Sequence, residues 1–179
     1  MEALLISEKT LKQYTLINNN MDGVYLLPAI RMAQEIDLDT IIGPALNKKL
    51  QALVADNSIS DESNSKYKLL LDEYVTPYLC FAVMSAVQIN INYKLTNSGT
   101  IQNDDERRSH LGYQENKNLQ AQYDKYTNAY AMKLKNFLCA HSNDYPEYNQ
   151  VLNYEGEEEP MLCSIYLNNG TQKYNYIGK

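Results

Sequence analysis

The chain has 179 residues and a net charge of −6, from 16 Lys and Arg against 22 Asp and Glu. This length predicts one domain with room for a hydrophobic core, and a hydrophobic content of 44% argues against wholesale disorder. The acidic balance argues against a protein that grips nucleic acid, because phosphate binding depends on a high density of cations.

The first part of the chain predicts short helices separated by turns. Ser7 is expected to cap a helix that ends near Tyr14. Leu27 precedes a proline and is therefore expected to be extended, with Pro28 in the first turn of a second helix. Apolar residues at helical spacing continue this second helix, namely Ile30, Ala33 and Ile36.

Two helix breaks are expected between residues 37 and 44. Asp37 or Asp39 can cap a further helical turn, because a short carboxylate accepts hydrogen bonds from the free N–H groups at a helix start. Gly43 is expected just after that turn, and Pro44 at the first position of the next helix. The apolar residues that this next helix should bury are Leu46, Leu50 and Leu53.

Two long helices are predicted in the second half, which makes the expected fold mostly α, a small helical bundle. One runs from Lys66 to about Leu95, and Pro77 should kink it because proline lacks an N–H donor. Its apolar stripe is Tyr67, Leu70, Leu71, Tyr74, Tyr78, Ala82, Ser85, Ile89 and Tyr93. The other runs from about Tyr113 to Ala140. Its stripe is Leu119, Tyr123, Tyr126, Tyr130, Leu134, Phe137 and Leu138. The spacing by three and four predicts that the two helices pack antiparallel.

The loop Thr96–Gly112 between the long helices is the longest inside the predicted domain, and a loop of this length is typically functional or mobile. Its candidate interface or channel residues are Asn97, Asp104, Asp105, Arg107 and Arg108. The two arginines could contact DNA phosphates, but the three acidic residues before them make local ion pairs the favoured alternative.

Residues 1–150 are expected to form the helical domain, and residues 151–179 an acidic linker followed by a C-terminal β-hairpin arm. Asn169-Gly170 is a strong signal for a two-residue hairpin turn between strands at residues 162–167 and 172–177. The arm residues that share the apolar face are Cys163, Ile165, Leu167, Tyr174 and Tyr176. An isolated hairpin is marginally stable in water, so this arm should dock on its own domain or on another chain.

Few residues suggest chemistry, and we expect neither an enzyme, nor a metal site, nor a cofactor. Only His110 and His141 are present, and Cys139 near His141 lacks the further ligands that zinc requires. The three cysteines are widely spaced, without a CxxC pair, and are expected to be reduced thiols. The longest apolar run, residues 78–87, is too short to span a bilayer, which needs about 20 residues, so no membrane partner is expected.

Three segments resemble the head–tail connector (adaptor, or head-completion) proteins of tailed bacteriophages, in the version found in crAss-like phages and prophages of gut Bacteroidales. These segments are AIRMAQEIDLDTIIGPALNKKL (residues 29–50), LLLDEYVTPYLCFAVMSAVQININYKLTNSGTIQND (residues 69–104) and MKLKNFLCAHSNDYPEY (residues 132–148). The two-helix step that ends in Ile-Ile-Gly and the terminal Tyr-Pro-Glu-Tyr carry most of the resemblance.

The resemblance implies a structural virion protein, made in the host cytoplasm and located at the neck of the particle. Copies would form a ring of twelve below the portal, joining the capsid to the tail and extending the DNA channel. The implied partners are other copies, the portal protein and the next tail or neck ring protein, with genomic DNA only passing through. An acidic channel would suit this role, because it repels the DNA backbone.

Two other functions stay open on the residues alone. One is a different phage neck or tail-completion component, such as a stopper. The other is a small cytosolic enzyme or regulatory domain, which should present a pocket with convergent polar groups and shifted pKa values.

Overall fold

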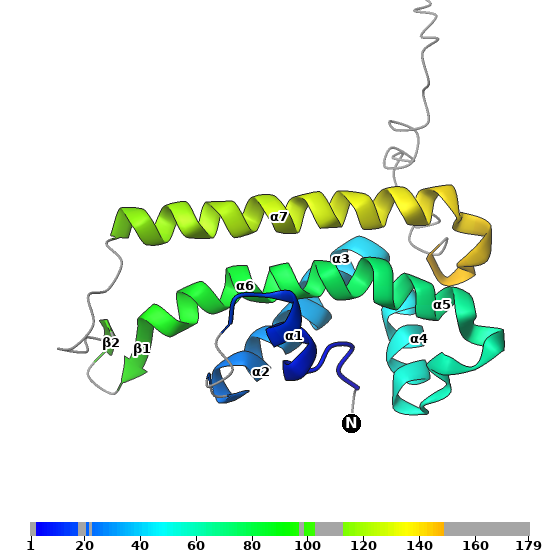
Figure 1. The fold of residues 1–179 in the computed structure, drawn as a ribbon, viewed down its shortest axis with the longest axis horizontal. Coiled ribbons are helices and arrows are strands. Elements are labelled where there is room, and N and C mark those ends of the chain that lie inside the picture. Colours follow the sequence, from blue (N-terminus) through cyan, green and yellow to red (C-terminus); the bar gives the residue numbers. More distant parts are fainter. Residues whose placement is uncertain (1–2, 18–20, 22, 97–98, 103–112, 149–179) are drawn as a thin grey trace, which may run out of the picture.

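The computed structural model describes residues 3–17, 21, 23–96, 99–102 and 113–148, with only the backbone for residues 88–96, 99–102 and 113. The described part is mostly helical, which confirms the predicted fold class (Figure 1). The predicted acidic linker and β-hairpin arm at residues 151–179 lie outside the described residues.

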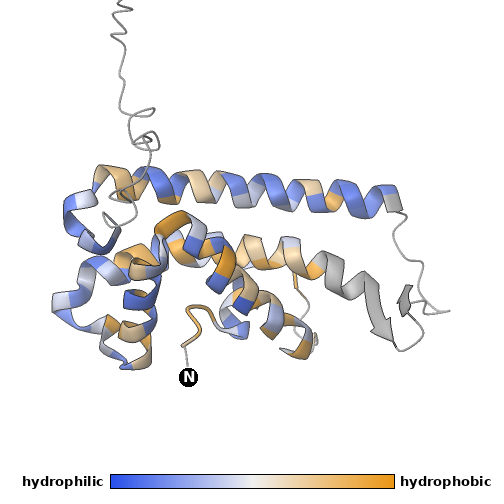
Figure 2. Cartoon of the chain, turned by 180° about the vertical axis from the view of Figure 1, so that it is seen from behind, coloured by the Kyte–Doolittle hydropathy of each residue, from blue (hydrophilic) through white to orange (hydrophobic). Residues whose placement is uncertain are grey.

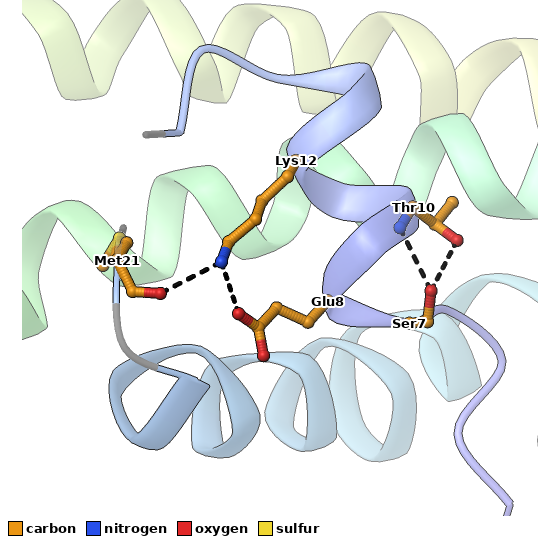
Figure 3. A network of polar contacts seen from close by, with 5 residues as sticks. All are labelled: Ser7, Glu8, Thr10, Lys12 and Met21. Carbon is orange, nitrogen blue, oxygen red and sulfur yellow. Dashed lines mark hydrogen bonds and ion pairs between the residues drawn. The ribbon is translucent and has the colours of Figure 1, made fainter. Parts of the chain in front are cut away.

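Helix α1 (Glu8–Tyr14) begins where the sequence predicts it. The Ser7 hydroxyl accepts a hydrogen bond from the Thr10 N–H at 3.1 Å, which is the expected capping bond (Figure 3). Lys12 pairs with Glu8 one turn earlier and donates to the Met21 carbonyl at 3.1 Å, so it ties the following segment to α1. A Cβ at Gly23 would lie 2.5 Å from the Glu8 carboxylate, so a side chain at the start of α2 would displace the flexible end of Glu8.

Helix α2 (Gly23–Met32) begins earlier than predicted. Pro28 lies inside it rather than in its first turn, and Leu27 is helical rather than extended, so both expectations are wrong. Leu26, Ala29 and Ile30 are buried, whereas five other apolar side chains of α2 and the next turn are exposed. The helix is therefore set by burial of one face, which outweighs the local preference for a break before proline.

A π-helical turn, η1 (Ala33–Asp37), joins α2 directly to α3 (Leu38–Ile42). The predicted cap is wrong, because Asp37 makes no capping bond and the Asp39 carboxylate instead accepts from the Asn47 side chain. A π-turn contains one extra residue, which rotates later side chains by about 100° on the helix surface. This rotation explains why Ile36, predicted on the buried stripe, is 57% exposed.

Gly43 separates α3 from α4 (Pro44–Ala55), as predicted. Its φ of 79° and ψ of 154° lie in a region that is essentially restricted to glycine. Pro44 occupies the start of α4, and Leu46, Leu50 and Leu53 are buried. Two short 3-10 turns, η2 (Ser58–Ser60) and η3 (Glu62–Asn64), follow α4.

The first long helical segment has three parts. They are α5 (Ser65–Leu70), the π-helical turn η4 (Leu71–Val75) and α6 (Thr76–Asn92). The irregularity lies directly before Pro77 and is a widened turn, in which the Thr76 N–H donates to the Leu71 carbonyl. Residues 62–87 are long and apolar enough to cross a membrane, but 67% of the apolar window is buried inside the protein, as in a core helix.

The end of this segment differs from the prediction. Helix α6 ends at Asn92, and the strand β1 (Tyr93–Thr96) pairs antiparallel with β2 (Gly99–Gln102), with Tyr93 opposite Gln102. The predicted loop therefore begins as a short hairpin, and the helix is three residues shorter than expected.

The second long helix, α7 (Tyr113–Ala140), has the predicted bounds and runs antiparallel along α6 (Figure 1). Leu134 and Leu138 are fully buried, whereas Tyr126 is 40% exposed, so the predicted stripe is core only toward its C-terminal end. Figure 2 shows the consequence, since α7 is largely hydrophilic while α6 is largely apolar.

An aromatic clasp holds the C-terminal end of α7 on α5 and η4. Tyr74 stacks on Phe137 at a centroid distance of 4.0 Å, and Tyr67 meets Tyr145 edge to face at 5.7 Å. The Tyr145 hydroxyl donates to the Lys66 carbonyl at 2.9 Å. The segment Tyr145–Tyr148, singled out by its sequence, thus closes the helical core, with both tyrosines buried.

The prediction of three reduced thiols is only partly right. Cys80 is a free, buried thiol, and burial raises its pKa to about 12. Cys139 is disulfide-bonded. Sequence spacing could not reveal this bond, because disulfide formation depends on the distance between the two residues in space.

Candidate functional site

A polar cleft of about 440 Å³ lies between α3, α6 and α7. Its lining residues are Asp37, Thr40, Ile41, Tyr78, Ala82, Ser85, Ala86, Asp124, Thr127, Asn128, Ala131 and Lys135. The facing positions of α6 and α7 are small here, including two alanines from α6 and one from α7. Small side chains leave the helices in contact at the cleft floor but cannot fill the space above it.

The π-turn η1 places Asp37 at the cleft. The Leu38 N–H donates to the Ala33 carbonyl instead of to Gln34, its partner in a regular α-helix. The Asn47 side chain compensates, because its amide donates to the Gln34 carbonyl at 2.8 Å. The extra residue in this turn brings Asp37 to the side of the helix that faces α6 and the cleft.

Gln34 also anchors the N-terminal segment beside the π-turn. Its side-chain oxygen accepts from the Leu5 N–H at 2.7 Å, and its amide donates to the Ala3 carbonyl at 3.0 Å. Gln34 is 1% exposed, so these bonds satisfy a polar group inside the core. The turn is thus held from two sides, by the chain before α1 and by α4.

Asp37, which is exposed, and Tyr78, which is buried, line the same cleft. Partial burial raises the pKa of the Asp37 carboxyl, and it forms no ion pair with a cation of the described residues. Burial raises the pKa of the Tyr78 phenol well above its usual value, and the Asp37 charge raises it further. The two groups are therefore electrostatically coupled.

The hydroxyl of Tyr78 is open to the cleft. Tyr78 is 3% exposed, and its hydroxyl has no hydrogen-bond partner among the described residues. No fully buried side-chain oxygen or nitrogen in the described part lacks a partner. The hydroxyl must therefore reach solvent through the cleft that Tyr78 lines, where an incoming group could bind it.

Asp124 and Lys135 lie at different ends of the cleft. They are eleven residues apart on α7, which corresponds to about 16 Å along the helix axis. Asp124 is bound to the Ser85 hydroxyl across the cleft. Because α6 and α7 are antiparallel, Lys135 is on the side where Tyr78 lies.

The cleft brings together several polar groups of different kinds. The Ser85 hydroxyl donates to the Asp124 carboxylate in the cleft, and His141 stacks on Phe137 at the far end of α7. No group of three His, Cys, Asp or Glu able to hold a metal occurs among the described residues. What the cleft offers is two carboxylates, one ammonium group and an unpaired phenol.

A second surface of interest is the outer face of α2 and η1, which we call the α2 face. Its exposed apolar side chains are Val24, Tyr25, Leu27, Met32 and Ile36. Arg31 and Glu35 lie among them and are exposed. Helix α2 packs against α6, and Figure 1 shows α2 and α7 on opposite sides of α6. The α2 face adjoins the cleft at η1, which contains Glu35 of the face and Asp37 of the cleft.

The residues predicted from sequence for an interface lie outside the part whose side chains are described. This holds for the loop residues Asn97, Asp104, Asp105, Arg107 and Arg108. It holds also for the arm residues Cys163, Ile165, Leu167, Tyr174 and Tyr176. Their roles stay predictions.

Sequence reasoning missed the cleft. Asp37 was expected as a helix cap, and Asp124 and Lys135 carried no signal because charged residues are usual on an exposed helix. A usable signal was present in Ala82, Ala86 and Ala131, since small residues at facing positions of two long helices predict a space between them.

Comparison with known proteins gives one match. No curated protein and no solved structure matches the chain. A family profile matches residues 38–158, about two-thirds of the 179 residues, and includes α3, α6 and α7 of the cleft. The chain therefore belongs to the DUF6712 family, a family of unknown function.

Proposed function

We propose that this chain is a structural protein of a tailed bacteriophage, which forms a ring below the portal and joins the capsid to the tail. The proposal starts from the resemblance of residues 29–50, 69–104 and 132–148 to head–tail connectors. The genomic DNA would pass through the ring, and the ring would present a surface for the next neck or tail protein.

The α2 face is the structural observation that best supports this proposal. Five exposed apolar side chains on one short helical stretch form a surface that a monomer would leave in water at a cost. Such a surface is typical of a subunit that associates with other chains.

The C-terminal arm is part of the same proposal. The hairpin that the sequence predicts at residues 162–177 would have unpaired strand edges and one apolar face, and addition to a neighbouring chain would satisfy both. Deletion of Glu159–Lys179 should therefore weaken ring assembly or attachment of the tail. Unchanged assembly together with unchanged tail attachment would refute this role.

The direct experiment is to measure the mass of the purified protein by light scattering and to image it by electron microscopy. We expect rings, either of the protein alone or after coexpression with the portal protein of the same phage. A monomer that neither assembles nor co-purifies with portal would contradict the proposal.

The polar cleft favours a second reading, a small ligand-binding or enzymatic domain. Convergent polar groups and a raised carboxyl pKa are features of such sites. A thermal-shift screen with small metabolites separates the two readings. A saturable rise in Tm that is lost in Tyr78→Phe, without any ring formation, would favour the second one.

A further inference from the structure

We propose that the α2 face of one copy docks on the α3–α6–α7 cleft of the next copy, with Arg31 pairing with Asp37 and Glu35 with Lys135. This inference rests on the proposed ring, and it names the surfaces that would join its subunits.

Four charged side chains of the two surfaces have no ionic partner among the described residues. None of Arg31, Glu35, Asp37 and Lys135 forms a side-chain hydrogen bond or an ion pair with another described residue. Asp37 is the clearest case, because it lines the cleft, partial desolvation raises the pKa of its carboxyl, and no described cation pairs with it. A charge in this situation gains from an opposite charge that arrives from another molecule.

The charges on the two surfaces are complementary. The α2 face carries a cation and an anion, Arg31 and Glu35, one helical turn apart and about 6 Å along the axis. The cleft carries the reverse, an anion and a cation, since Asp37 and Lys135 line the same hollow. Opposite charges on the two sides fix the orientation of a contact and disfavour other pairings.

An arginine side chain also fits the neutral groups of the cleft. A guanidinium group has five N–H donors, so it can bind the Asp37 carboxylate and still donate to an oxygen nearby. The phenol oxygen of Tyr78 is such an acceptor, and it has no partner among the described residues. Arginine surrounded by apolar side chains is a common anchor of protein interfaces.

The placement of the surfaces suits a ring. The α2 face and the cleft consist of different residues, so one copy can offer each surface to a different neighbour. Contacts between two different surfaces of identical chains are head to tail, and they close into rings when the rotation between neighbours allows it. A self-complementary patch would give a dimer instead.

The test is reversal of one charge pair in the full-length protein. Arg31→Asp should weaken self-association at least about tenfold, and so should Asp37→Arg, because each places like charges in contact. The double variant Arg31→Asp with Asp37→Arg restores an opposite pair and should recover most of the assembly. Sedimentation velocity at several concentrations, with electron microscopy of the products, measures this.

Two further variants test whether the effect is specific to these surfaces. Lys48→Asp changes the charge of an exposed residue on α4 that lies in neither surface, and its assembly should equal that of the wild type. Met32→Ser removes an exposed apolar side chain of the α2 face and should weaken assembly. The circular dichroism spectrum of this variant should equal that of the wild type, because the fold does not depend on an exposed side chain.

The outcomes separate this inference from the proposed function. Rings that form equally well from Arg31→Asp overturn the inference and leave the ring-forming function intact. Loss of assembly in both single variants without recovery in the double variant overturns the pairing. Wild-type protein that forms no ring, alone or with portal, overturns both.

Discussion

The side-chain amide of Asn47 donates a hydrogen bond to the main-chain carbonyl of Gln34 at 2.8 Å. The bond joins α4 to the π-turn η1, at a carbonyl whose usual helical donor is engaged elsewhere. Asn47 is 2% exposed and also contacts the Asp39 carboxylate and the Gln51 amide. One buried side chain thus supports the irregular turn that carries Asp37 to the cleft.

Substitution of Asn47 by Ala should destabilise the fold by about 2 kcal/mol, because it leaves a buried carbonyl with one partner fewer. The free energy of unfolding in urea measures this. Lys48→Ala, at the exposed neighbouring position, is the matched control and should change it by less than about 0.5 kcal/mol. Equal stability of both variants would show that η1 does not depend on Asn47.

Substitution of Gly43 by Ala should cost about 1–3 kcal/mol, because the observed φ of 79° with ψ of 154° excludes a Cβ. Gly43→Asn should be no better, since asparagine tolerates the left-handed helical region but not this one. Urea unfolding of both variants gives the comparison. A clear advantage of Asn over Ala would mean that the turn has left-handed helical geometry instead.

Removal of the Tyr145 hydroxyl tests the aromatic clasp. Tyr145→Phe should lose about 1 kcal/mol with the bond to the Lys66 carbonyl, and Tyr145→Ala about 3–5 kcal/mol with the buried ring. Hydrogen exchange at the C-terminal end of α7 should speed up in the Ala variant. Tyr14→Ala removes a tyrosine that is 48% exposed and should leave stability nearly unchanged. Exchange rates unaffected by Tyr145→Ala would refute the role of the clasp.

Alkaline pH should weaken the fold through its buried tyrosines. Burial first, and then the charge of Asp144, raise the pKa of Tyr145 to about 12 from the usual 10.0. The native state thus favours the neutral phenol of Tyr145, and below pH 10 this phenol makes its full contribution to the free energy of unfolding. This contribution is lost as the pH rises from about 10 to 12, because the unfolded chain then releases the proton more readily.

The measurement is urea unfolding at pH 8, 10 and 11. Tyr145→Phe should show a shallower loss of stability with pH than the wild type, since one of the titrating groups is absent. Tyr14→Phe should follow the wild-type curve. Identical slopes for Tyr145→Phe and the wild type would contradict the assigned environment.

Elements set by local rules were predictable from the sequence. The bounds of α7, the Ser7 cap and the Gly43–Pro44 step all follow from interactions within a few residues, namely helical periodicity, capping and the backbone freedom of glycine. Departures occur where a distant contact decides. Pro28 is helical because the opposite face of α2 is buried, and η1 forms where Asn47, thirteen residues away, satisfies its spare carbonyl.

The sequence by itself thus determined that the chain is mostly helical and where its two long helices lie, because a spacing of three and four residues is a local property of an amphipathic helix. Only the tertiary structure decided which residues meet. A π-turn shifts every later side chain by about 100°, and this shift brings Asp37 to the cleft and leaves Ile36 in solvent. The cleft exists because small residues of α6 and α7 face each other, which depends on the register of helices that are far apart in the chain.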